Sequence, residues 1–185
     1  MRITYDTILK DTDPRLRNPS QPVKTPLSTK HLALAKRMLR YVKDSRDEEK
    51  AEKYNLRPAV GLAAPQVGEF VQIIMVMVDQ ADDEPTVYLL ANPKIIAHSV
   101  QNSALATGEG CLSVEDPHPG YVLRHARITV RAYDILDQKD VIIKEDGYAA
   151  VVLQHEIDHL NGVLFYDRIN KTNPWEQAPN LILID

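Results

Sequence analysis

Two histidines and a glutamate stand at a spacing that suits metal-dependent hydrolysis. They lie in the segment His155-Glu156-Ile157-Asp158-His159. Residues four apart share one face of a helix, so both imidazoles can bind one cation. Glu156 can then take a proton from water that the cation activates and deliver it to the leaving group. The segment therefore predicts a metal-dependent hydrolase with Glu156 as the general acid–base.

A catalytic metal site also needs a third protein ligand. In one metalloprotease pattern this ligand is a histidine six residues after the second motif histidine, but Phe165 stands there and cannot bind a metal. In another protease class the third ligand is a downstream glutamate on a second helix. Glu176 lies at a suitable distance along the chain, but its segment contains prolines, which disfavour a helix. Cys111 is the better candidate because a thiolate is a strong, soft ligand for zinc or iron. A lone cysteine is otherwise more often a small buried hydrophobic residue.

The helix that carries the motif has to be buried. Residues 149–153 are apolar almost all round a helix, and we predict that it spans 148–161 and ends at Gly162. Histidines and acids on such a helix are costly without partners, which disfavours the alternative of ordinary core histidines. We therefore expect Asp158 to pair with Arg124, which lies in a strand predicted to cross near the helix.

The rest of the chain predicts a mixture of helix and short strands. The expected elements are a proline-rich irregular arm to Leu27, a helix capped by Ser28 with a charged continuation over 43–53, a loop over 61–68, a turn at 82–85, a structured loop over 107–120, and strands over 70–78, 87–91, 95–96, 122–134, 141–145 and 181–184. We predict an α+β fold in which antiparallel β-sheets pack around a central buried helix carrying His-Glu-x-x-His. Residues 1–185 are expected to form a single catalytic domain.

Composition restricts the functional class further. The formal net charge is -4, which does not suggest a nucleic-acid-binding protein. One cysteine excludes a disulfide within the chain. The longest apolar run, 73–78, is too short to cross a bilayer, and the N-terminal segment does not resemble a secretion signal. These features predict a cytoplasmic protein without membrane contact.

Three segments together resemble bacterial peptide deformylases. They are Gly61-Leu62-Ala63-Ala64-Pro65-Gln66, Glu109-Gly110-Cys111-Leu112-Ser113 and Gln154-His155-Glu156-Ile157-Asp158-His159, in the order and approximate separations of that family. The similarity extends from Asp11 to about Asp167. The long segment before the Gly61 loop, the stretch 114–121 and the short apolar tail resemble the Gram-positive, type 2 subclass.

The resemblance implies a reaction and a set of roles. Family members remove the formyl group from the N-terminal formyl-methionine of newly made polypeptides and release formate. By resemblance, Cys111, His155 and His159 bind one divalent metal, usually Fe2+, although Zn2+, Ni2+ and Co2+ can occupy the site. Glu156 is the acid–base, and the Gln66 side chain and the Leu112 N–H donate to the oxyanion. The implied partners are N-formylmethionyl nascent peptides, with transient contact to the ribosome, and the protein is expected to be a monomer.

Several residues are expected to bind the substrate. Gly61 lacks a Cβ, so a peptide could pair with the backbone there as an added strand, and Gly110 suits close approach of a ligand. Val60, Leu112, and Leu153 or helix residues near it, are expected to line the pocket for the methionine side chain.

Two other classes remain open on the sequence. One is a metallopeptidase that uses Glu176 as its third ligand. The other is a non-catalytic, zinc-stabilised binding module, in which Glu156→Ala would leave the biological activity intact. An inactive family member is disfavoured because every expected catalytic residue is present.

Overall fold

The computed structural model describes residues 2–80 and 84–185. Its α-helices are α1 (Thr29–Ser45), α2 (Glu48–Lys53) and α3 (Gly147–Leu160), and its short 3-10 turns are η1 (Tyr5–Thr7), η2 (Pro14–Arg17), η3 (Ala64–Val67) and η4 (Phe165–Arg168). Its strands are β1 (Gly61–Ala63), β2 (Ile73–Val78), β3 (Thr86–His98), β4 (Asn102–Leu105), β5 (Arg124–His125), β6 (Arg127–Asp134), β7 (Lys139–Asp146) and β8 (Ile182–Ile184). None of the described helices is long and apolar enough to span a membrane.

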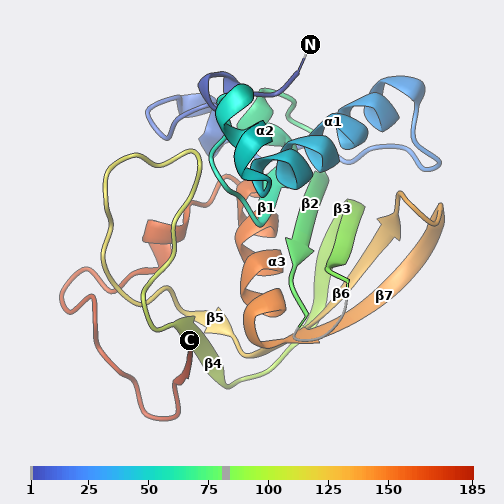
Figure 1. Cartoon of the computed structure of the whole chain (residues 1–185). Helices are drawn as coiled ribbons and strands as arrows, with labels where there is room; N and C mark the ends of the chain where they lie inside the picture. Colours follow the sequence, from blue (N-terminus) through green and yellow to red (C-terminus); the bar gives the residue numbers. More distant parts are fainter. Residues whose placement is uncertain (1, 81–83) are drawn as a thin grey trace.

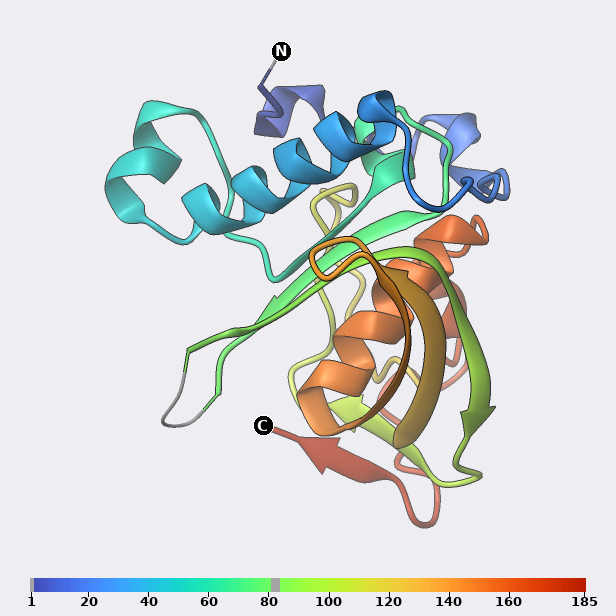
Figure 2. The same cartoon turned by 90° about the vertical axis from the view of Figure 1, so that its right-hand side faces the viewer.

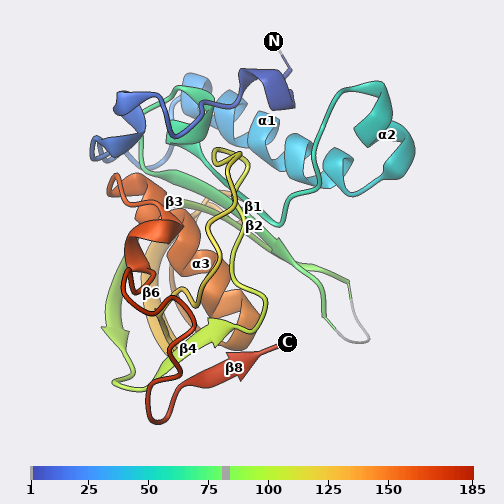
Figure 3. The same cartoon turned by 90° about the vertical axis from the view of Figure 1, so that its left-hand side faces the viewer.

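The strands form two sheets with α3 between them. The larger sheet is antiparallel and has the order β1-β2-β3-β6-β7, and the smaller has the order β5-β4-β8. Helix α3 contacts β1 and β2 of the larger sheet and β4 and β5 of the smaller one (Figure 1). The predicted α+β class with antiparallel sheets is confirmed, with one exception. Strand β8 pairs in parallel with β4 (Figure 3), and no hairpin fixes their relative direction because the two strands are far apart in sequence.

Strand β2 is the centre of the core, and its two faces pack against different helices. Ile73, Met75 and Met77 belong to the hydrophobic cluster that contains the buried side of α1. Ile74 and Val76 point the other way, into the cluster that contains α3. Figure 2 shows α1 and α3 on opposite sides of this strand, with the larger sheet curving around α3. A strand covered on both faces is apolar throughout, which is why its sequence predicted a buried strand.

Local signals place several boundaries correctly. The Ser28 hydroxyl accepts a hydrogen bond from the His31 N–H at the start of α1, as its expected capping role requires. Helix α3 ends one residue before the predicted boundary, and Gly162 follows it with a left-handed φ of 72°. The predicted C-terminal strand is confirmed as β8. Positions 82 and 83 of the predicted turn lie outside the described residues.

Three sequence expectations about the strands are wrong. The expected loop at 61–68 contains β1 and η3, because Gly61–Ala63 pairs with β2 despite its turn-forming neighbours. The strands expected at 87–91 and 95–96 are one strand, β3, with register irregularities between them. The strand expected over 122–134 is divided into β5 and β6, which join different sheets. Beside this break, the Gln154 side chain accepts a hydrogen bond from the His125 N–H and donates one to the His125 carbonyl, each with an N–O distance of 2.9 Å.

Candidate metal centre

Two elements bring the three predicted metal ligands together. Helix α3 carries His155 and His159 on one face, with ring centroids 5.0 Å apart. The segment between β4 and β5 supplies Cys111, whose Sγ lies 3.3 Å from the His159 Nε2. The potential ligand atoms of all three residues lie within 4.8 Å of one another, and within residues 2–80 and 84–185 no other group of three or more such residues is found. Glu176 lies elsewhere, where its Oε2 accepts a hydrogen bond from the Asn170 side chain.

The three donors fit a divalent transition metal. One sulfur and two imidazole nitrogens are the ligand types that zinc and iron accept. Burial lowers the pKa of His155, but its hydrogen bonds with Cys111 and Glu109 outweigh burial and raise that pKa well above its ordinary value. Burial lowers the pKa of His159, so that imidazole is neutral. The raised pKa of His155 indicates that its surroundings favour positive charge. The neutral imidazole of His159 has a nitrogen lone pair that can bind a metal ion.

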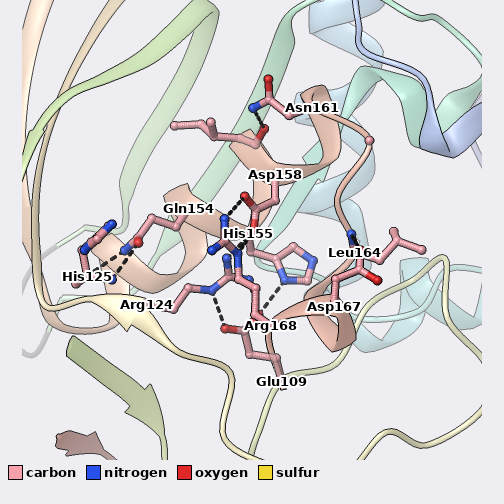
Figure 4. A network of polar contacts seen from close by, with 12 residues as sticks. Glu109, Arg124, His125, Gln154, His155, Asp158, Asn161, Leu164, Asp167 and Arg168 are labelled. Carbon is pink, nitrogen blue, oxygen red and sulfur yellow. Dashed lines mark hydrogen bonds and ion pairs between the residues drawn. The ribbon is translucent and has the colours of Figure 1, made fainter. Parts of the chain in front are cut away.

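Glu109 orients the first histidine. Its Oε2 lies 2.8 Å from the His155 Nδ1, which directs the other ring nitrogen toward the ligand cluster. Both Glu109 oxygens also accept hydrogen bonds from Arg124, each at 2.8 Å (Figure 4). Burial alone raises the pKa of Glu109, but the bonds from Arg124 and His155 lower it to about 2. The carboxylate is therefore ionised and can strengthen His155 as a ligand.

The same arginine makes the predicted ion pair with the helix. Arg124 donates to Asp158, so this sequence prediction is confirmed. Asp158 also accepts two hydrogen bonds from Arg168, at 2.6 and 2.7 Å. Figure 4 shows Arg124 between the Glu109 and Asp158 carboxylates. The Arg124 side chain is only 1% exposed. A buried cation thus joins the segment carrying Cys111 to the helix carrying the histidines.

Removal of this cation is expected to destabilise the fold strongly. Arg124→Met leaves two buried carboxylates without their shared partner, and we expect the free energy of unfolding to fall by roughly 3–5 kcal/mol. Arg168→Met is the matched control, because Arg168 pairs with the same Asp158 but its side chain is 42% exposed. Its loss should cost about 1 kcal/mol or less. Urea unfolding of metal-loaded protein measures both, and equal losses would contradict this account.

Glu156 lies beside the ligands with its carboxyl group buried. Its Oε2 has no hydrogen-bond partner in the part of the chain that the structure describes. Burial raises the pKa of Glu156 to about 7. A carboxyl group with such a pKa can both take up and release a proton near neutral pH. Gly61 provides the room for it, because a Cβ there would lie 2.8 Å from the Glu156 Cδ and closer still to its Oε1.

Gln66 and Leu112 bring two N–H donors to the same place. The Gln66 Oε1 accepts from the Ala63 N–H at 2.8 Å, which fixes the amide so that its Nε2 lies 3.5 Å from the Cys111 Sγ. That Nε2 also lies 3.1 Å from the Ser113 Oγ. Among the described residues, the Leu112 N–H has no hydrogen-bond acceptor. Two N–H donors therefore adjoin the cysteine.

A cavity of about 760 Å³ opens over these residues. The predicted site residues that line it are Val60, Gly61, Gln66, Gly110, Cys111, Leu112, His155 and Glu156. Leu153 itself does not line it, because its side chain is fully buried in the cluster between α3 and the larger sheet. The neighbouring helix residues Val151 and Val152 line the cavity, which agrees with the predicted alternative to Leu153. Consecutive helix positions differ by about 100° in direction, so the position facing the cavity depends on the rotation of α3.

Sequence reasoning missed three polar residues of the site. Glu109 and Ser113 belong to the quoted motif segments, but no role was inferred for either. Arg168 lies in η4, beyond the motif, and its sequence position gives no sign that it reaches Asp158. Arg124 was predicted because Asp158, an acid on a buried helix, needs a charged partner. A search for a second partner of Asp158 on the same argument could have identified Arg168.

Comparison with known sequences identifies the family of this chain. A model of the polypeptide deformylase family matches residues 5–175. Peptide deformylase 2 of Bacillus subtilis (strain 168) is 46% identical over 183 residues, covering 99% of this chain and 99% of the relative. A peptide deformylase of Streptococcus pyogenes serotype M5 is 47% identical over 192 residues, covering 99% and 94%. These relatives agree with the resemblance to Gram-positive proteins.

Solved structures of the family share the fold. Peptide deformylase from Ehrlichia chaffeensis superposes with a TM-score of 0.72 at 30% identity, covering 93% of this chain and 90% of that one. The enzyme from Thermotoga maritima gives 0.67 at 32% identity, covering 88% and 96%. A metallopeptidase and a non-catalytic binding module, the classes left open by the sequence, are not supported. The chain belongs to the peptide deformylase family, whose metal-dependent members remove the N-formyl group from the N-terminal methionine of new polypeptides.

Proposed function

We propose that Cys111, His155 and His159 hold the metal ion and that Glu156 is the acid–base for deformylation by this chain. The observation that carries this assignment is the convergence of three ligand atoms and one unpartnered carboxyl group at one cavity. The helix between the two sheets is then the catalytic helix, and residues 1–185 work as one catalytic domain. Formate release from formyl-methionyl peptides, compared between the native protein and variants of these residues, tests the assignment.

The metal ion and the side chains of the protein have different roles in the proposed reaction. When bound, a divalent ion makes hydroxide available near neutral pH and polarises a carbonyl group. Glu156 takes the proton of the attacking water and delivers it to the amine nitrogen of methionine as the bond to the formyl carbon breaks. Its buried position keeps this proton within the site. Formate and a free N-terminus are the products.

Gln66 and the Leu112 N–H stabilise the charge that develops on the formyl oxygen. Both donors are in place before the substrate binds, so little reorganisation is needed in the transition state. Gln66→Glu keeps the oxygen that accepts from Ala63 and removes the amide donor. We expect a fall in turnover of roughly 10²–10³-fold, measured as formate release per bound metal. Turnover within a few-fold of the native value would remove Gln66 from this role.

The substrate backbone binds along β1. This strand is at the edge of the larger sheet, so one side of it can pair with an extended peptide. Gly61 and Gly110 line the cavity without side chains, and Val60 and Leu112 contribute apolar wall for the methionine side chain. Formyl is the smallest acyl group, so a confined space beside the ligands can exclude larger ones.

Gly61→Ala is expected to separate metal binding from catalysis. The new Cβ displaces the Glu156 carboxyl group, whereas the Cys111 and histidine donors are not in its way. Because misplacement by about 1 Å can cost roughly 10²-fold, we expect a loss of that order with normal metal content. Formate release and metal analysis on one sample measure both, and unchanged turnover would show that Glu156 tolerates the displacement.

The metal, the partners and the location are further parts of the proposal. Fe2+ is the proposed resident ion, with Zn2+, Ni2+ and Co2+ as alternatives that a Cys/His/His site also accepts. The protein is proposed to act as a cytoplasmic monomer on nascent chains, with transient contact to the ribosome. Metal analysis of protein purified without oxygen tests the resident ion, and sedimentation alone and with ribosomes tests the monomeric state and the ribosome contact.

A further inference from the structure

Three consecutive residues of the N-terminal arm hold the two segments that carry the oxyanion donors. The Leu9 N–H donates to the Gln66 carbonyl at 2.8 Å. The Lys10 Nζ donates to the Leu112 carbonyl at 3.1 Å. The Asp11 N–H donates to the Ser113 carbonyl at 2.8 Å. The arm therefore bridges η3 to the segment between β4 and β5, which Figure 3 shows reaching from the smaller sheet toward the arm.

The ammonium group of Lys10 is held in place by its own neighbours. It lies 3.4 Å from the centre of the Tyr5 ring and 3.6 Å from the Glu115 carboxylate. The Tyr5 hydroxyl donates to the same Glu115 oxygen at 3.1 Å. The Lys10 side chain is 24% exposed, so these contacts are partly shielded from water. A lysine restrained by a ring and an acid can fix a backbone carbonyl more firmly than a free one.

We propose that Lys10 is a positioning residue for deformylation, acting through Leu112. This inference rests on the proposed function, in which the Leu112 N–H and the Gln66 amide donate to the same oxyanion. The two donors come from segments far apart in sequence, and donors at an oxyanion must be placed within tenths of an ångström. The Leu112 carbonyl belongs to the peptide unit that follows the one carrying the Leu112 N–H, so Lys10 restrains this donor through the backbone dihedral angles of Leu112. Lys10 does not line the cavity, so it acts without touching the substrate.

The test is a comparison of kcat and KM in two variants. Lys10→Met removes the ammonium group, and we expect kcat to fall roughly 10-fold to 10²-fold with KM and metal content unchanged. Lys10→Arg retains a cation that can reach the carbonyl and should restore kcat to within about threefold of the native value. If Lys10→Met should fail to fold, Tyr5→Leu is the second variant. It removes the ring that holds the Lys10 ammonium group but keeps the hydrogen bond to Leu112. We expect kcat to fall less than in Lys10→Met, with KM unchanged.

A control separates this role from general effects. Lys139→Met removes an exposed lysine at the start of β7, where it pairs with Asp137. It should keep kcat within about twofold of the native value, since Lys139 makes no contact with the residues that position the oxyanion donors. Lys10→Met with native kcat, a rise in KM alone, or no rescue by arginine would overturn the inference. Active Glu156→Gln would instead overturn the proposed function, so the two failures are distinguishable.

Discussion

Replacing Cys111 with serine is expected to remove most of the bound metal and, with it, nearly all deformylation. A serine hydroxyl is a far weaker ligand for iron or zinc than a thiolate. Loss of a partner that only supports a ligand already costs about 10–100-fold in metal affinity, so loss of a ligand itself should cost more. Metal per protein after dialysis and formate release from a formyl-methionyl peptide measure the two effects together.

The control for this variant is a buried position outside the cavity. Ser103 lies on β4, and its hydroxyl is buried without a hydrogen-bond partner among the described residues. Ser103→Ala should therefore retain both metal and turnover. A Cys111→Ser protein that keeps a full complement of metal would show that the third ligand is a different residue.

Replacing Glu156 with glutamine should give the opposite pattern, with metal retained and turnover lost. Glutamine has nearly the same size but cannot accept and return the proton. Loss of general acid–base catalysis typically costs about 10²–10⁴-fold, and we expect a fall in kcat within this range. The ligand atoms of Cys111, His155 and His159 are unchanged, so metal content should equal that of the native protein.

A second glutamate offers a matched comparison. The Glu109 side chain is also buried, and it hydrogen-bonds to His155, so in the proposed assignment it supports a ligand and takes no part in proton transfer. Glu109→Gln should therefore lower metal affinity by roughly 10–100-fold, and turnover per bound metal should change less. If both glutamine variants lose metal and activity in the same proportion, the separation of roles between Glu156 and Glu109 is wrong.

The sequence predicted the parts of the site that depend on local spacing or on burial cost. The two histidines and Glu156 follow from a helical repeat, which a chain can encode within five residues. The pair of Asp158 and Arg124 followed from the cost of an acid on an apolar helix. Cys111 was predicted as the third ligand by elimination and by the resemblance.

Features that depend on distant contacts could not be predicted in the same way. The break between β5 and β6 lies next to His125, whose backbone groups bond to a helix side chain, that of Gln154. The exclusion of Leu153 from the cavity depends on how α3 is rotated against the larger sheet. The parallel pairing of β8 depends on the path by which the C-terminal segment reaches β4. Each needs the positions of segments that are far apart in sequence, and periodicity carries no information about those positions.

The most direct test of the central claim is formate released per bound metal. The protein is purified without oxygen, loaded with Fe2+, and given a formyl-methionyl peptide or its acetyl counterpart. We expect formate in proportion to iron bound by the native chain, little hydrolysis of the acetyl peptide, and almost none by Glu156→Gln with the same iron content. Fully iron-loaded native protein that releases no formate would contradict the assignment of this cavity as a deformylase site.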